Sequence, residues 1–93
     1  MNPSPVVELN RAVAVAMADG PEAGLELVDG LAADGRLDRY HLLHSTRADL
    51  LARLGRHAEA QEAYRAALEL VSNPVERSFL EARLTELAGR PGP

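Results

Sequence analysis

Apolar residues recur every three to four positions along most of this chain, the spacing of helices that bury one face. Glycine and proline interrupt the pattern at short intervals and mark where helices end and begin. The pattern predicts five helices joined by short connections, over residues 5–18, 21–33, 38–54, 58–71 and 74–88. The final residues, 89–93, contain only Gly, Pro and one Arg, so we expect this tail to fray.

The strongest local signal lies in residues 50–70, LLARLGRHAEAQEAYRAALEL. Ala60 and Ala67 are small enough to let two helices approach closely, and Tyr64, one turn from each, can fill the space between them. Small and large residues at these offsets are typical of a tetratricopeptide repeat, a helical hairpin that usually serves as a binding scaffold. We therefore expect Tyr64 to be buried between the third and fourth predicted helices.

A weaker copy of the same pattern precedes it. Gly20 lies 35 residues before Gly55, close to the repeat length of about 34 residues. The turn that follows Gly20 is two residues shorter than the turn that follows Gly55. With this difference allowed for, Ala23 aligns with Ala60, Leu27 with Tyr64, Gly30 with Ala67, and Leu31 with Leu68. The chain is therefore predicted to be all-α, with residues 1–93 forming two antiparallel helical hairpins and a C-terminal capping helix.

Composition limits the possible chemistry. The net charge is −4, which argues against direct binding of nucleic acid, because duplex binders need clustered positive charge. The chain has no cysteine, and its apolar stretches are much shorter than the roughly 20 residues of a membrane span. No stretch resembles a signal peptide, so a cytoplasmic location without membrane association is expected.

No catalytic motif is present. The serines lie outside any G-x-S-x-G context, and no glycine-rich phosphate loop occurs. His41 and His44 can share a helix face with Asp38 one turn back, but a structural metal site needs four closed ligands. The sequence therefore predicts no enzyme activity, no cofactor and no metal, with these histidines partly exposed near a helix start.

Polar residues on the first helix of each predicted hairpin, and on the capping helix, are candidates for a binding groove. In a tetratricopeptide array these helices line the concave face. The candidate binding residues are Asn10, Arg11, Ser45, Asp49, Arg53 and Arg83, with Met17, Thr46, Glu76 and Phe79 beside them. The alternative is that they are ordinary exposed charges, with Arg83 paired to a neighbouring glutamate.

The sequence also resembles a known bacterial group. The segment Ser4–Leu70 closely resembles the C-terminal extension of certain extracytoplasmic-function sigma factors, and Asn73–Leu87 is similar to the end of that extension. The most specific stretches are Ser4–Val15, Tyr40–Leu43, Arg47–Leu51 and Leu54–Arg56. In that group, two regions that recognise the −10 and −35 promoter elements precede a tetratricopeptide-like domain.

The resemblance implies a regulatory domain of an alternative sigma factor. Such a domain is expected to control transcription initiation through contacts with the sigma regions of the same factor, with core RNA polymerase or with a regulator. Neither promoter-recognising region is present, so the chain is expected to be part of a longer protein. The alternative is a free-standing tetratricopeptide adaptor that binds a peptide segment in its groove.

Overall fold

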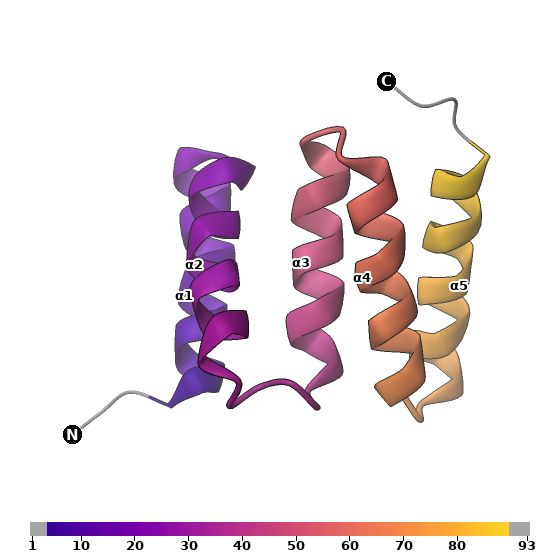
Figure 1. The fold of residues 1–93 in the computed structure, drawn as a ribbon, viewed down its shortest axis with the longest axis horizontal. Helices are drawn as coiled ribbons and strands as arrows, with labels where there is room; N and C mark the ends of the chain where they lie inside the picture. The colour runs from indigo at the N-terminus through magenta and orange to yellow at the C-terminus, as the bar shows by residue number, and fades with distance from the viewer. Residues whose placement is uncertain (1–3, 90–93) are drawn as a thin grey trace.

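The computed structural model describes residues 4–89, and this part of the chain forms five helices and no strand. The helices are α1 (Pro5–Asp19), α2 (Pro21–Asp34), α3 (His41–Arg53), α4 (His57–Leu70) and α5 (Pro74–Ala88). They stand side by side in chain order, within extents of 45 × 30 × 20 Å (Figure 1). Two helical hairpins followed by a single helix confirm the predicted all-α, tetratricopeptide-like fold.

Most helix ends lie next to glycine, proline or capping residues, and four of the five helices agree with the prediction within one residue. Ser4 caps α1, because its Oγ accepts a hydrogen bond from the backbone N–H of Val6 at 3.2 Å. Asn73 caps α5 in the same way, accepting from the N–H groups of Val75 and Glu76. Apart from Gly89, which ends α5, the predicted frayed tail lies outside the described residues.

The third helix begins at His41, three residues later than predicted. The preceding residues form a turn in which the N–H of Asp38 donates to the carbonyl of Gly35 at 3.3 Å. Leu37 is buried in the core, and Gly35 has a φ of 83° that favours glycine. Burying Leu37 therefore requires a turn in this connection, and the helix can start only after it.

The second hairpin has the predicted packing. Tyr64 is 2% exposed, and Ala60 and Ala67 are fully buried. The small side chains at 60 and 67 sit in the same core cluster as Ala48 and Leu51 of α3. The ring of Tyr64 thus belongs to the core between α3 and α4, which confirms the expectation from the sequence.

The first hairpin has a register different from the predicted one. Leu27 is 43% exposed, and no atom lies within 4 Å of a Cβ added at Gly30, so neither residue is part of the core. The buried layer instead pairs Gly24 with Ala60, Val28 with Tyr64 and Leu31 with Ala67. The repeat is therefore 36 residues, the distance between the helix starts at Pro21 and His57. The alignment counted from the turn glycines was wrong by one residue.

The order of packing opens a groove on one face. Each hairpin packs internally, α2 packs against α3, and α4 packs against α5, whereas α1 and α3 touch only slightly. The helices α2 and α4 lie toward the viewer in Figure 1, and the opposite face presents α1, α3 and α5. Among the described residues, no helix combines the length and apolar character needed to cross a membrane.

Candidate functional site

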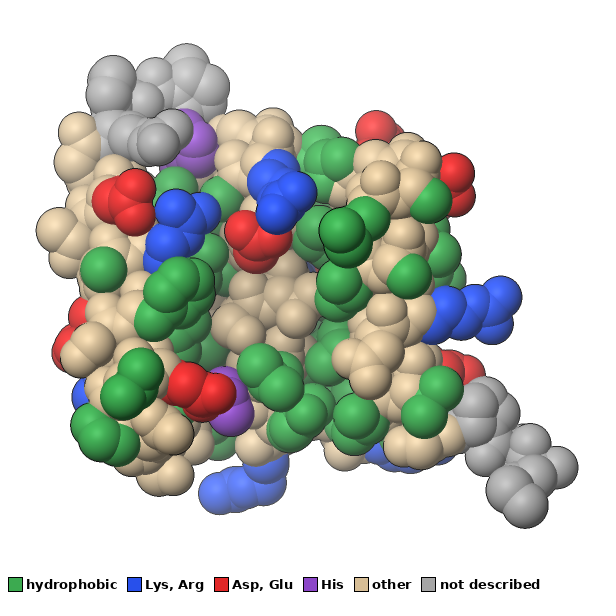
Figure 2. All heavy atoms as spheres, turned by 180° about the vertical axis from the view of Figure 1, so that it is seen from behind, with side chains coloured by type: hydrophobic (Ala, Val, Ile, Leu, Met, Phe, Trp, Pro, Cys, Tyr) green, Lys and Arg blue, Asp and Glu red, His purple; other side chains and the backbone are tan. Residues whose placement is uncertain are grey.

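The concave groove runs along α3 between α1 and α5. It consists of four adjoining depressions that share lining residues, and the largest, at the centre, has a volume of about 320 Å³. We define the groove by Val13 and Met17 of α1, Ser45, Thr46, Asp49 and Arg53 of α3, and Phe79 and Arg83 of α5. Figure 2 shows this face, hollowed along its middle between α5 on the left and α1 on the right.

The rims of the groove are apolar and exposed. Met17 and Val13 project from α1, and Met17 is 82% exposed. Phe79 projects from α5 on the other side and is 63% exposed. Large apolar side chains gathered around a hollow are the usual mark of a contact surface for another molecule, since isolated exposed apolar residues do not cluster in this way.

One end of the groove carries a cluster of charges. The Nε of Arg53 donates to Oδ2 of Asp49 at 3.0 Å, and Nη2 of Arg83 lies 3.9 Å from Oδ1 of the same carboxylate. Arg83 also reaches Oε2 of Glu86 at 3.3 Å. Two basic and two acidic side chains thus balance one another, and the cluster joins α3 to α5.

Tyr64 links the core to this cluster. It lines the central depression although its ring is buried. Interaction of the guanidinium with the Tyr64 side chain raises the pKa of Arg83, and attraction to Glu86 and Asp49 adds to the effect, outweighing the opposing effect of partial burial. Tyr64 therefore lies at the floor of the groove, and the ion-pair partners of Arg83 are Asp49 and Glu86 on its walls.

Four predicted binding residues come together in the groove: Ser45, Asp49, Arg53 and Arg83. Asn10 is exposed three residues before Val13, on the same face of α1, although it lines none of the four depressions. That any of these residues binds a partner stays a prediction.

Arg11 lies elsewhere. It lines a separate depression of about 230 Å³ with Glu8, Val15, Leu27 and Leu31, between α1 and α2. Two residues along a helix correspond to a rotation of about 200°, so Arg11 and Val13 point to opposite sides of α1. The structure therefore does not bring Arg11 into the groove, contrary to the grouping inferred from the sequence.

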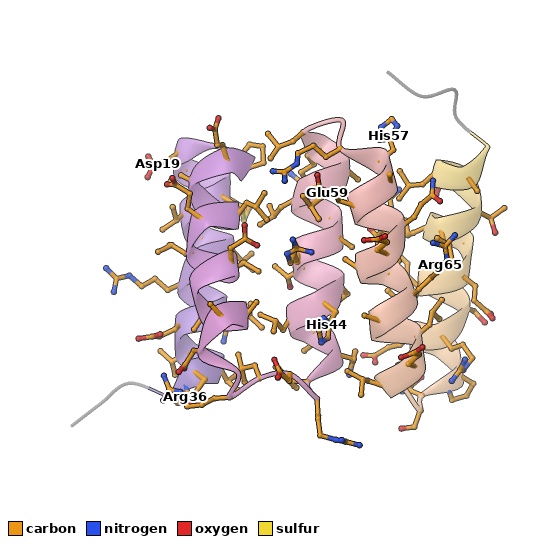
Figure 3. All side chains as sticks on the ribbon, in the orientation of Figure 1. Asp19, Arg36, His44, His57, Glu59 and Arg65 are labelled. Atoms are coloured by element: carbon orange, nitrogen blue, oxygen red, sulfur yellow. The ribbon has the colours of Figure 1, made fainter. Side chains whose placement is uncertain are left out.

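The three histidines are directed to different surroundings. The Nε2 of His41 lies 2.8 Å from Oε2 of Glu76, an ion-pair distance without hydrogen-bond alignment. The Nε2 of His44 lies 2.8 Å from the carbonyl oxygen of Asp38. Figure 3 shows His44 in the lower half of α3 and His57 at the upper end of the same hairpin. Within residues 4–89, no three His, Asp or Glu side chains gather as metal ligands would.

Sequence reasoning missed Val13 as a groove residue and did not place Glu86 beside the groove. Val13 lies three residues after Asn10 and four before Met17, so helical spacing alone could have indicated it. Glu86 follows Arg83 by three residues, and the sequence offered it only as one of three possible ion-pair partners of Arg83, with Glu76 and Glu81. The role of Tyr64 in the groove floor had no signal in the sequence, because its spacing indicated only burial.

Comparison with known proteins supports the repeat assignment. Residues 41–74, which span α3, α4 and the start of α5, match the tetratricopeptide repeat family. The chain is 44% identical over 91 residues to an uncharacterized protein of Rhizobium meliloti (strain 1021). The alignment covers 98% of this chain but only 21% of that relative, so the chain spans about a fifth of its length. No solved structure matches the chain significantly.

Proposed function

We propose that this chain is a protein-binding domain that holds a segment of a partner protein in its concave groove. Tetratricopeptide repeats are typically protein-interaction modules rather than enzymes, and residues 41–74 match that family. The observation that carries the proposal is the groove itself, with apolar rims at Met17 and Phe79 and ordered polar groups at Asp49 and Arg83. Apolar rims give affinity, and fixed polar groups give register to a bound segment.

We further propose that the domain is the C-terminal regulatory part of an alternative sigma factor. The support is the resemblance of Ser4–Leu70 to the extension of that group, together with the length of the Rhizobium relative. About four fifths of that relative lies outside the alignment, which leaves room for two or more further domains. In this proposal the groove binds the sigma regions of the same factor, and the domain itself contacts no DNA.

The test uses the full-length factor and two arginine substitutions. Arg83→Ala should change transcription from a target promoter several-fold, because losing a desolvated charge contact costs about 2–5 kcal/mol in binding. The matched control is Arg65→Ala on α4, whose Nη2 donates to Oε1 of Gln61 at 3.4 Å and which forms no ion pair within residues 4–89. Figure 3 labels Arg65 on α4, away from the groove. Losing such an exposed contact costs about 0–1 kcal/mol.

The proposal has two levels, a protein-binding groove and a role in a sigma factor. Measuring whether the domain binds the isolated sigma regions distinguishes them. A complex with those regions that Arg83→Ala weakens supports both levels. If the groove binds a protein other than the sigma regions or polymerase, the domain is an adaptor and the sigma assignment is wrong. If Arg83→Ala and Arg65→Ala both leave promoter output and binding unchanged while the helices stay folded, the groove is not the working surface.

A further inference from the structure

Exposed apolar side chains gather around the groove. Four large apolar residues that remain exposed line its depressions, and they come from all three groove helices: Val13, Met17, Leu42 and Phe79. Figure 2 shows apolar side chains on both sides of the hollow, over α1 and over α5. Because they flank one hollow, a single molecule lying in it can cover them together and remove their surface from water.

The charged side chains of the groove already balance one another. Every Asp, Glu and Arg side chain that lines the four depressions lies at ion-pair distance from another group of the groove. These residues are Asp49, Arg53, Glu76, Arg83 and Glu86. The basic group beside Glu76 is the imidazole of His41, whose Nε2 lies 2.8 Å from the carboxylate. The groove therefore offers a partner no charge that lacks an opposite charge nearby.

Elsewhere on the molecule the charges are arranged differently. Most Asp, Glu and Arg side chains outside the groove, within residues 4–89, lie at no such distance from an opposite charge, among them Arg11, Glu22 and Glu62. In the central depression, the hydroxyl of Ser45 also donates within the molecule, to the carbonyl of Leu42 at 3.3 Å. The groove thus combines exposed apolar side chains with polar groups that interact among themselves.

We propose that the groove binds the uncharged, apolar face of a helical segment of its partner, an inference that rests on the protein-binding function proposed above. A charged group of a partner would compete with an ion-pair partner that the groove already supplies, and it would lose its own hydration on entering. An apolar side chain meets no such cost and gains from covering Met17 and Phe79. Charge complementarity therefore selects a segment whose groove-facing side chains are neutral and apolar, such as Leu, Met or Phe.

The paired charges keep a role in this arrangement. Arg83 lies 3.9 Å from Asp49, so the cluster links α5 to α3 beside the bound segment. A partner that covers the cluster excludes water from it. Removing Arg83 would then leave Asp49 and Glu86 with fewer partners in a drier place, which weakens binding. The effect expected for Arg83→Ala therefore holds for a neutral partner as well.

Three synthetic helical peptides of equal length test the chemistry of the occupant. One presents a face of Leu, the second a face of Glu and the third a face of Lys, with Gln and Ala at the remaining positions. Calorimetric titration into the 93-residue chain, at concentrations where each peptide is monomeric, should show the Leu peptide binding at least about tenfold more tightly than the other two. Its dissociation constant should change less than about twofold between about 0.05 and 0.5 M NaCl, because salt screens only charge–charge attraction.

Two rim substitutions and one control test whether the peptide lies in the groove. Met17→Ser and Phe79→Ser should each weaken binding of the Leu peptide at least about tenfold, because each removes a large apolar side chain from the contact. Val7→Ser is the matched control and should leave binding unchanged, since Val7 is 57% exposed on α1 but lines none of the four depressions. All three side chains are largely exposed, so circular dichroism should show the same helicity in each variant.

Three outcomes would overturn the apolar occupant. The first is a Glu or Lys peptide that binds at least as tightly as the Leu peptide. The second is no binding of the Leu peptide up to about 1 mM, which corresponds to a very weak complex. The third is binding that Val7→Ser weakens as much as Phe79→Ser does. The proposed function is judged separately, by binding of the sigma regions and its loss in Arg83→Ala, so a groove that prefers a charged segment would keep that function and lose only the apolar occupant.

Discussion

The two hairpins share one register but close the space between their helices in different ways. In α1–α2 the layer contains Gly24 and Val28, and a Cβ added at Gly24 would lie 2.5 Å from that of Ala16. The backbones therefore approach until little space remains. In α3–α4 the equivalent residues are Ala60 and Tyr64, and the buried aromatic ring fills the space between the helices.

Because of this difference, only the second hairpin has a residue of this core layer that also lines the groove. Val28 ends within the core, whereas Tyr64 lines the central depression and raises the pKa of Arg83. The match to the tetratricopeptide family also falls on the second hairpin, at residues 41–74. The first hairpin supplies an apolar rim, and the second supplies a floor with polar character.

Among the substitutions that test this comparison, removing the ring of Tyr64 should have the largest effect on the free energy of unfolding. Tyr64→Ala is expected to lower the free energy of unfolding by about 3–5 kcal/mol, because it leaves a large cavity between α3 and α4. Such a loss is a large part of the total stability of a small domain, about 5–15 kcal/mol. Urea unfolding followed by circular dichroism measures it. Tyr64→Phe is the matched control and should cost about 1 kcal/mol, since only the hydroxyl is lost.

The close approach in the first hairpin gives the next largest effect. Gly24→Ala should cost about 1–3 kcal/mol, because its Cβ meets Ala16 and α1 must shift away. Gly30→Ala is the same substitution in the same helix, at a position open within 4 Å. It should stabilise the domain by about 0.5–1 kcal/mol, since alanine favours a helix interior over glycine. If both variants shift the melting temperature in the same direction, the corrected register of α2 is wrong.

These positions also show what the sequence could and could not predict. Helix ends marked by Ser4, Gly20 and Asn73 were predictable, because caps and breakers act locally. The register of α2 was not, since it contains Leu27 and Val28 side by side and a slip of one residue leaves an apolar side chain in either place. The late start of α3 depends on burial of Leu37, which is a tertiary effect.

The sequence predicted the groove residues of α3 better than those of α1, because the two helices differ in how many neighbouring helices pack against them. Other helices pack on both sides of α3, so one direction remains for its polar residues. Ser45, Asp49 and Arg53 face the groove in that direction. Helix α1 packs mainly against α2, and its polar residues occur both toward the groove and beside the depression between α1 and α2. Assigning Arg11 to the groove failed for that reason.

An ion pair between the hairpins offers a smaller test. The Nε of Arg47 on α3 donates to Oδ1 of Asp29 on α2 at 2.8 Å, and both side chains are partly exposed. A double-mutant cycle with Arg47→Ala and Asp29→Ala should give a coupling of about 0.2–1 kcal/mol. Raising the salt concentration to about 1 M should reduce it, because screening shortens the range of the attraction. A coupling that is zero at low salt would show that packing alone joins the hairpins.

The smallest effect is expected at the start of α4. Neither α2 nor α4, the second helices of the two hairpins, has a side-chain hydrogen bond at its N-cap. Hydrogen bonding from Arg56, whose Nη2 lies 2.6 Å from Oε2, lowers the pKa of Glu59 below its value in the unfolded chain. A carboxylate with a lowered pKa stabilises the folded state above its unfolded pKa, and this contribution disappears as the pH falls through the folded value. Glu59→Gln should therefore be less stable than the parent chain at about pH 6, and the two unfolding curves should converge toward about pH 3. The control Glu22→Gln, in the first turn of α2, removes a carboxylate without an ion-pair partner among residues 4–89 and should be destabilised less than Glu59→Gln at about pH 6. A constant difference between Glu59→Gln and the parent from pH 6 to pH 3 would mean that the carboxylate acts through packing, and that the first turn of α4 does not depend on its charge.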